Sequence, residues 1–494
     1  MKTMTKRLLV LLLAAIMVLS VLAACQNGGT PSDGTAAVPV TNGNNPGGET
    51  GAETAQSGPN IPVFDMDGFS INFLNYAEGS GYSKATLDVE YSEGIDIVDE
   101  AIYRRNRNIE DTYTCEISVY GVTAPHTTLN TAVGSGDDSF DVAMVYEEFI
   151  SQVLENVRSW KDMPYVDLTA DWWNKNANTV FNIRGIQFAA TGDFSLSQYN
   201  KIYAFVYNKE LYENFNVGYD LYEGVRNHTW TMDRLYEIAK PFNRNLDGDA
   251  NTVSDEDGHG IVATSKVLFS MLLTGAGARI IENDYNDEPA FALTKPEYLN
   301  ILEKMVEINL VDGYYRNVPE SNGGLRWDEY NSGNTLFYAA IFSAIDGTRS
   351  LPFSTGYMPA PLLNEEQEDY HTIAIGCNVA VLPKSLPTER MNNVGILLEA
   401  LSYLSRSTVV TTYRDTYLKT KLANEDDAEM IQLMFDTVDY DLGNNLFARK
   451  GRLDINDRIF HTLERNFTST LEVLGTDLEN QISDVLEKLE EIDD

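Results

Sequence analysis

The fold of this chain is decided by the stretch Phe140-Asp141-Val142-Ala143-Met144-Val145-Tyr146, which is followed directly by Glu147 and Glu148. Its apolar residues form a run that is short enough for a buried strand. In open α/β sheets, ligands are bound at the carboxyl ends of the strands. A buried strand that ends in polar side chains therefore indicates a sheet edge that faces a pocket.

The residues after this strand predict a second lobe. A polar and aromatic middle section contains Trp172 and Trp173, which we expect to be packing residues, and leads to the small-residue turn Ala190-Thr191-Gly192-Asp193-Phe194. The run from Ile202 to Leu211 then predicts a second strand that leads into a helix. Two strand-to-loop units joined through a glycine turn favour two α/β lobes that face each other.

Taken in order, these segments resemble a known family. The sequences FDVAMV, WWNKNA, ATGDFSL and FVYNKELYENF are similar, in this order and spacing, to the extracellular solute-binding proteins of ABC importers, family 1, of the sugar-binding lipoprotein type. The resemblance extends from about Gly68 to the C-terminus. It implies an α/β, two-lobed periplasmic-binding-protein-like fold of type II, whose lobes are joined by crossover hinge segments. It also implies a monomer that captures a sugar or oligosaccharide between the lobes and delivers it to the permease subunits of an importer.

Length and charge limit the possible classes of function. A chain of 494 residues exceeds one comfortable core, so more than one domain is expected. The formal net charge of −38 repels the phosphate backbone of nucleic acids, so we expect no nucleic-acid partner. The same acidic charge suits a secreted protein that must remain soluble.

The N-terminus is typical of an exported lipoprotein. Lys2, Lys6 and Arg7 precede an apolar run that ends in Leu22-Ala23-Ala24-Cys25. Such a pattern predicts a signal peptide over residues 1–25. Leu-Ala-Ala-Cys is similar to the lipobox of bacterial lipoproteins, which implies lipidation of Cys25. We therefore expect localisation at the cell membrane, lipid-anchored on the extracellular face; an ordinary cleavage site with an incidental Cys is the alternative.

Residues 26–66 predict a flexible, disordered tether, because Gln26 to Asn60 are rich in Gly, Thr, Ser, Asn, Pro and Ala. The folded body then divides into two predicted lobes. The first is expected to span residues 67–195 plus 357–386, and the second, which is richer in helix, residues 196–356 plus 387–494. Thr355 to Pro361 resembles the segment in which the chain of that family crosses back to the first lobe, and Thr372 to Pro383 would return it. Each is a short extended piece that can absorb the dihedral change of a hinge.

The candidate ligand-binding residues combine carboxylates with aromatic rings. Rings can stack on the C–H faces of a sugar, while carboxylates and amides accept and donate hydrogen bonds to its hydroxyls. Some candidates follow predicted strands, one lies at the crossing, and the others belong to the second lobe. They are Glu78, Tyr146, Glu147, Glu148, Asp193, Trp230, Trp327 and Tyr330.

An acidic stretch in the second lobe has the rhythm of a calcium loop. Asn245, Asp247, Asp249, Asn251 and Glu256 alternate as in an EF-hand or dockerin loop, although Ala250 replaces the glycine that such a loop places sixth. The sequence leaves open a structural calcium ion or a solvated acidic turn. No cofactor is otherwise required.

No enzymatic motif accompanies these features. The five His residues show no metal-ligand spacing, and there is no Gly-x-Ser-x-Gly elbow or Walker loop. We therefore expect a binding protein and not an enzyme; an exported carbohydrate-active enzyme and a surface glycan adhesin or sensor subunit are the alternatives. Cys115 and Cys377 both fall in the predicted first lobe, where two free thiols are favoured over a disulfide.

Overall fold

The structure is a computed structural model that describes residues 58–78, 85–249, 254, 256–310, 315–318, 323–342, 345–348, 350–418, 422 and 424–493. The predicted signal peptide, Cys25 and most of the predicted tether lie outside these residues, so the lipidation of Cys25 stays a prediction. Among the described helices, none has the length and apolar character needed to cross a lipid bilayer.

A five-stranded sheet forms the core of the first lobe, in the order β2-β1-β3-β15-β4. β1 is parallel to both β2 and β3, whereas β15 is antiparallel to β3 and β4. The strand predicted within residues 140–146 is confirmed as β3. The strand bounds are Phe69–Tyr76 for β1, Cys115–Val122 for β2, Val142–Tyr146 for β3, Val157–Arg158 for β4 and Asn378–Pro383 for β15.

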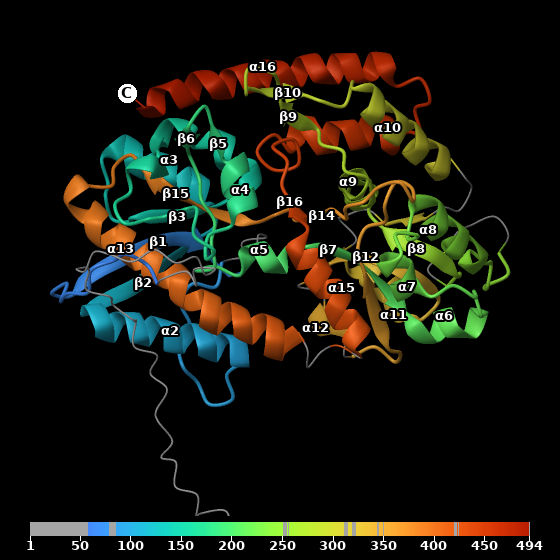
Figure 1. Ribbon diagram of the computed structural model, residues 1–494, viewed down its shortest axis with the longest axis horizontal. Helices are drawn as coiled ribbons and strands as arrows, with labels where there is room; N and C mark the ends of the chain where they lie inside the picture. Colours follow the sequence, from blue (N-terminus) through green and yellow to red (C-terminus); the bar gives the residue numbers. More distant parts are fainter. Residues whose placement is uncertain are drawn as a thin grey trace, which may run out of the picture. The chain divides into compact units, whose positions relative to one another are not determined.

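Helices cover both faces of this sheet (Figure 1). α2 (Ile97–Tyr113) and α13 (Thr388–Ser405) pack together on one face, and α3 (Pro125–Ser135) packs against β1 and β3 on the other. α13 is held there by Arg390, whose Nε and Nη2 donate to the buried carboxylate of Asp141 at 2.6 and 2.8 Å.

The second five-stranded sheet has the order β11-β8-β12-β7-β13. β8, β11 and β12 are parallel to one another, and β7 lies antiparallel between β12 and β13. The apolar run from Leu336 to Ile341 lies in strand β12. The bounds are Tyr203–Asn208 for β7, His259–Ala263 for β8, Arg316–Asn317 for β11, Thr335–Ile341 for β12 and Thr355–Met358 for β13.

The helices around the second sheet are α6 (Lys209–Phe215), α7 (Leu221–Arg226), α8 (Met232–Ala239), α9 (Ser265–Gly275), α10 (Pro296–Asn309), α11 (Gly323–Asn331), α12 (Ile345–Thr348) and α15 (Glu425–Asp436). Several of these helices begin at a side-chain cap, whereas α10 begins without one. At the start of α8, for example, the Thr231 hydroxyl accepts a hydrogen bond from the Arg234 N–H at 3.3 Å.

Two segments are placed differently from the predicted lobe boundaries. Tyr357 and Met358 were expected in the first lobe, but they belong to β13 and pair with β7 in the second sheet. α13 was expected in the second lobe, but it packs against α2 and β1. For α13, the physical reason is the ion pair between Asp141 and Arg390. A sequence pattern cannot reveal this pair because its members lie far apart in the chain. The division into lobes as a whole stays a prediction.

The C-terminal helix α16 (Thr468–Asp493) contacts elements of both halves of the chain. Leu478, Ile482, Val485 and Leu489 form its buried face. The Thr476 hydroxyl lies inside the helix and donates to the Glu472 carbonyl. The helix also reaches the first sheet, since Lys488 pairs with Glu155 of η2 (Leu154–Asn156), next to β4.

Candidate functional site

Three stretches of chain pass between the two sheets. The first contains the bridges Ala190 to Ala380 and Ile202 to Ala374, and the second is the extended run that leads from β14 (Thr372–Ile373) into β15. The third contains β16 (Val438–Asp439), which pairs in parallel with β14. We call them the crossing segments. Two groups of polar side chains lie along these segments.

The first group follows β3 at its carboxyl end. It consists of Tyr146, Glu147, Glu148, Lys201 and Arg452, and we call it the strand-end group. Glu147 is 1% exposed, and its Oε1 accepts a hydrogen bond from the Gly376 N–H at 2.5 Å. Burial raises the pKa of Glu147 to about 7, although the Gly376 hydrogen bond acts in the opposite direction. Burial also lowers the pKa of the Lys201 ammonium.

Glu148 connects this group to the C-terminal part of the chain. Nη2 of Arg452, in the helical turn η9 (Arg449–Leu453), lies 3.9 Å from Oε2 of Glu148. The two side chains are 11% and 19% exposed, so this is a largely buried ion pair. Arg452 is oriented by its own Nε, which donates to the Asn444 carbonyl at 3.0 Å.

Glycine is the residue type that fits at position 376, beside Tyr146. Its φ of +87° lies in the left-handed region, and a Cβ on it would lie 2.2 Å from the Tyr146 hydroxyl oxygen. The crossing segment therefore runs directly against the tyrosine ring.

Strand ends of the second sheet approach the same region. α9 begins at Ser265, directly after β8, and the Asn317 side chain at the end of β11 accepts a hydrogen bond from the Ser265 N–H at 3.1 Å. The Ser265 hydroxyl in turn accepts one from Nδ2 of Asn456, three residues after η9, at 3.3 Å. α9 also contacts η9 itself. Carboxyl ends of parallel strands from both sheets therefore meet around η9.

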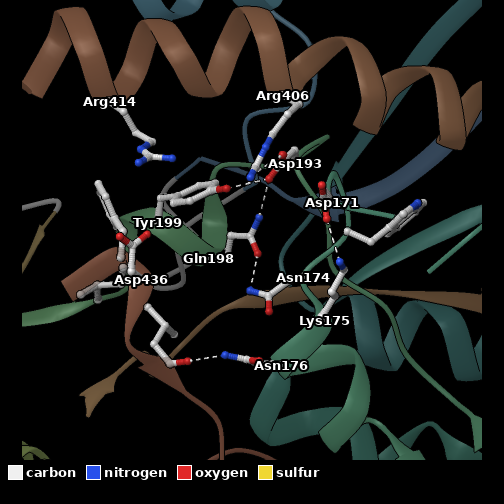
Figure 2. Close-up of a pocket in the computed structure, with 14 residues that line it drawn as sticks. Asp171, Asn174, Lys175, Asn176, Asp193, Gln198, Tyr199, Arg406, Arg414 and Asp436 are labelled. Atoms are coloured by element: carbon white, nitrogen blue, oxygen red, sulfur yellow. Dashed lines mark hydrogen bonds and ion pairs between the residues drawn. The ribbon is translucent and has the colours of Figure 1, made fainter. Parts of the chain in front are cut away.

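The second group lines a cavity of about 350 Å³, to which the crossing segments contribute Ile202 and Val438 (Figure 2). None of the strand-end group lines it. Its walls come from α4 (Lys175–Val180) and the turn before it, from α5 (Ser197–Asn200), from the helical turns that follow α13 and from α15. The lining residues are Asp171, Trp173, Asn174, Lys175, Asn176, Asp193, Gln198, Tyr199, Ile202, Arg406, Arg414, Phe435, Asp436 and Val438.

Asp193 organises one wall of this cavity. The carboxylate is 2% exposed and accepts hydrogen bonds from Gln198 Nε2 at 3.1 Å, Tyr199 OH at 2.7 Å and Arg406 Nη1 at 3.3 Å. Burial raises its pKa to about 6 against the opposing effect of these donors. Burial acts to lower the pKa of Arg406, but Asp193 outweighs it and leaves that pKa above its ordinary value. Figure 2 shows the network continuing from Gln198 to Asn174, whose Nδ2 donates to Gln198 Oε1 at 2.6 Å.

Trp172 and Trp173 form the support behind this wall, as expected for packing residues. Their indole nitrogens donate to the two oxygens of Glu399 at 2.8 Å each. Burial raises the pKa of Glu399 to about 6. Trp173 is 2% exposed, so although its edge lines the cavity it offers no open face.

Three of the predicted aromatic residues pack against other groups of the second half of the chain. Trp230 is fully buried, and its indole N–H donates to the Pro359 carbonyl at 3.0 Å. Tyr330 is also fully buried, with its ring 5.4 Å from that of Tyr338. Trp327 is half-buried against Tyr330, at 6.3 Å between ring centroids. Trp230 and Tyr330 therefore have no free face on which a sugar could stack. The prediction that they are ligand platforms is wrong, because both are core residues.

Glu78 is exposed just beyond the end of β1, at a separate cavity of about 360 Å³ between the ends of β1 and β2. The structure thus separates the predicted residues. Tyr146, Glu147 and Glu148 lie together, whereas Asp193 belongs to the cavity of Figure 2 and Glu78 to a third place.

The predicted calcium loop is held by hydrogen bonds within the loop. Asp247 accepts from the Asp249 N–H at 2.8 Å and from the Ser254 hydroxyl at 2.8 Å, and Asn245 accepts from the Gly248 N–H at 2.7 Å. Asn251 lies outside the described residues. Within the described parts of the chain, no group of three or more His, Cys, Asp or Glu residues could hold a metal ion. Calcium binding stays a prediction that depends on the undescribed part of the loop.

Cys115 and Cys377 are free thiols, as favoured from the sequence. Cys377 is fully buried beside the strand-end group, and burial raises its pKa well above the ordinary value. Cys115 at the start of β2 is only half-buried.

Sequence reasoning missed Arg452 and most of the cavity of Figure 2. Arg406 and Arg414 belong to the π-helical turns η7 (Arg406–Val410) and η8 (Thr412–Leu418). Their spacing of eight residues, in a stretch otherwise rich in Ser and Thr, was a usable signal, because positions i and i+8 share one helix face. Arg452 offered no comparable pattern.

The comparisons with known proteins identify the fold. No model of a known protein family matches the sequence, and no curated protein matches it. Many solved structures are similar. The cyclic alpha-maltosyl-1,6-maltose binding protein from Arthrobacter globiformis is 15% identical, with a TM-score of 0.56 over 85% of this chain and 99% of that chain.

Two further structures agree with this result. The sugar-binding protein MalE from Xanthomonas citri is 13% identical, with a TM-score of 0.55 over 84% of this chain and 98% of that chain. The extracellular solute-binding protein from Staphylococcus aureus in complex with maltose is 11% identical, with a TM-score of 0.54 over 85% and 98%. The chain therefore has the two-lobed α/β fold of these proteins, and the resemblance stated from the sequence is confirmed at the level of the fold.

Proposed function

We propose that this protein captures a sugar or oligosaccharide between its two lobes, at the strand-end group, and delivers it to an ABC importer. The observation that carries the proposal is the meeting of strand ends from both sheets around Glu148 and Arg452. In open α/β sheets the carboxyl ends of strands are where ligands bind. The fold likeness to proteins that bind maltose and related sugars supports the same ligand class.

The chemistry of the strand-end group suits a polyhydroxylated ligand. Glu148 and Arg452 form a largely buried pair whose charged atoms are 3.9 Å apart, longer than a direct hydrogen bond. A sugar hydroxyl can donate to the carboxylate and accept from the guanidinium, which bridges the pair. Tyr146 supplies a ring beside it, and buried Glu147 fixes the neighbouring crossing segment through Gly376.

Ligand capture would then couple to lobe movement. Glu148 follows β3 of the first sheet, whereas Arg452 packs with α9 of the second. A ligand that contacts both side chains stabilises the arrangement in which the two sheets approach each other. The crossing segments supply the extended backbone about which such closure takes place.

Lipid anchoring through Cys25 would place the protein on the extracellular face of the cell membrane, next to permease subunits. The predicted tether of residues 26–66 is long enough to hold the folded lobes just off the bilayer, since a flexible chain of this length spans roughly 30 Å. Mass spectrometry of the N-terminal peptide from membrane-extracted protein tests this proposal. A diacylated Cys25 supports it, and an unmodified mature N-terminus contradicts it.

A thermal-shift screen against mono- and oligosaccharides tests the binding function. A ligand at about one hundred times its dissociation constant adds about 2.7 kcal/mol of stability. We expect a saturable shift with one class of saccharide and no products when the sugar is recovered. Products would favour the carbohydrate-active enzyme. Binding without any importer subunits encoded beside the gene would favour the adhesin or sensor, and no shift with any saccharide would overturn the proposal.

A further inference from the structure

The cavity of Figure 2 is a site in its own right. Its lining includes none of the strand-end group, and its central carboxylate, Asp193, is satisfied by Gln198, Tyr199 and Arg406. The chain segments 197–202 and 374–378 run between the cavity and the strand-end group. Hydrogen bonds join these two segments, such as that from the Asn378 N–H to the Ser197 hydroxyl at 2.8 Å. An inference about this cavity therefore does not rest on the saccharide site at Glu148.

The charges around the cavity do not all pair with one another. Lys175 Nζ lies 2.7 Å from Asp171 Oδ1, and Arg406 Nη1 lies 3.3 Å from Asp193 Oδ2. Among the described residues, no carboxylate forms an ion pair with Arg414, the third cation. Asp436, the third carboxylate, is exposed and accepts a hydrogen bond from Gln432 Nε2 at 2.7 Å.

The guanidinium of Arg414 is positioned by an aromatic ring and a neutral side chain, which leaves it suited to bind an anion. The guanidinium lies 5.7 Å from the centroid of the Phe435 ring, and its Nη2 donates to the neutral side-chain oxygen of Gln432. Figure 2 shows both arginines reaching from the same helical segment into the cavity, with the Arg414 guanidinium directed toward Tyr199. A half-buried guanidinium stacked on a ring and lacking a carboxylate is suited to bidentate binding of one.

The remaining lining limits the size and chemistry of the ligand. A volume of about 350 Å³ lies within the range of small-molecule sites and exceeds the needs of a bare carboxylate such as acetate. The amides of Asn174 and Gln198 and the exposed pair Asp171–Lys175 also line the cavity and offer donors and acceptors. These groups suit a ring that carries several hydroxyls.

We propose that this cavity binds a hexuronate, a sugar ring with one carboxylate. The carboxylate pairs with Arg414 and displaces Gln432, while the ring hydroxyls contact Asn174 and Asp171. Arg406 remains with Asp193 and adds positive potential without direct contact.

Calorimetric titration with D-glucuronate and D-glucose tests this site, because the two sugars differ only in the carboxylate at the sixth carbon. We expect saturable 1:1 binding of glucuronate and affinity for glucose weaker by about tenfold or more. Arg414→Gln abolishes this difference between the sugars, and Arg414→Lys retains part of it because the charge remains. Thermal unfolding of each variant checks that it is folded.

Two controls locate the binding. Arg226→Gln changes an arginine whose partners are the surface carboxylates Glu223, Asp426 and Glu429, and it should leave glucuronate binding unchanged. Glu148→Gln should also leave it unchanged; a loss there would place the uronate in the strand-end group and overturn the assignment to this cavity. Glucuronate that fails to bind, binds no better than glucose, or binds Arg414→Gln as well as wild type would overturn it too.

Discussion

Nη2 of Arg452 and Oε2 of Glu148 lie 3.9 Å apart. Glu148 follows a strand of the first sheet, whereas Arg452 belongs to a turn more than 300 residues later that packs against α9 of the second sheet. Their charged atoms are close enough to attract each other, and too far apart for a direct hydrogen bond. The pair therefore joins the two halves of the chain at a place where a ligand hydroxyl can be inserted.

Removing either charge should weaken saccharide binding. Glu148→Gln and Arg452→Gln each remove one charge and with it one charge-assisted hydrogen bond, so we expect affinity to fall by about ten- to a hundredfold. Isothermal titration with the best saccharide from the screen measures this, with Arg226→Gln as a surface control. Unchanged affinity in both variants would remove the pair from the binding site.

Gly376→Ala should destabilise the fold through the Tyr146 contact. The variant forces a Cβ to 2.2 Å from the tyrosine oxygen at a φ of +87°, and we expect a loss of more than about 1–3 kcal/mol, the cost of backbone strain alone. Gly94→Ala is the matched control, because Gly94 has a φ of +81° and open space around it. In the Tyr146→Phe background the cost of Gly376→Ala should be smaller. Equal costs in both backgrounds, measured by urea unfolding, would refute the contact.

The buried carboxyl of Glu147 should make stability fall as pH rises. Its pKa is about 7 in the folded protein against an ordinary value of 4.5. Between these two pH values the folded state therefore binds the proton more tightly than the unfolded state does. Stability relative to Glu147→Gln is therefore greatest below pH 4.5 and decreases up to pH 7, by at most about 3 kcal/mol. The other raised carboxyls titrate in both proteins and cancel in the difference. A difference that is flat or increases with pH would contradict this.

Trp230 should matter for stability and not for ligand binding. Trp230→Ala empties a fully buried site and should cost about 3–5 kcal/mol. Trp230→Phe leaves the Pro359 carbonyl without its donor and should cost about 1–3 kcal/mol while saccharide affinity is retained. Tyr285→Ala, at a side chain that is 95% exposed, should stay within about 0.5 kcal/mol of wild type. Lost affinity in Trp230→Phe would restore the sequence-based prediction.

The sequence predicted the strands well because their signal is local. The runs ending at Tyr146 and beginning at Ile202 each depend on neighbouring residues, and β3 and β7 formed there. The candidate site was predicted only where polar residues directly follow a strand or a glycine turn, as at Glu147 and Asp193.

The parts that failed depend on distant residues. Trp230 resembles a sugar platform in the sequence, but its indole finds the carbonyl of Pro359, 129 positions away. α13 was assigned to the wrong half because the carboxylate that holds it, Asp141, lies 249 positions earlier. Arg452 reaches Glu148 only through the packing of η9 on α9. Local patterns contain no information about such pairings.

The central claim is that this protein binds a saccharide between its lobes without altering it. The most direct test is a calorimetric titration of the purified protein with the best saccharide, on wild type and Glu148→Gln, followed by chromatography of the recovered sugar. The account predicts one site per chain, weaker binding in the variant and an intact sugar. Binding that is indifferent to Glu148, or a sugar that is cleaved, would contradict it.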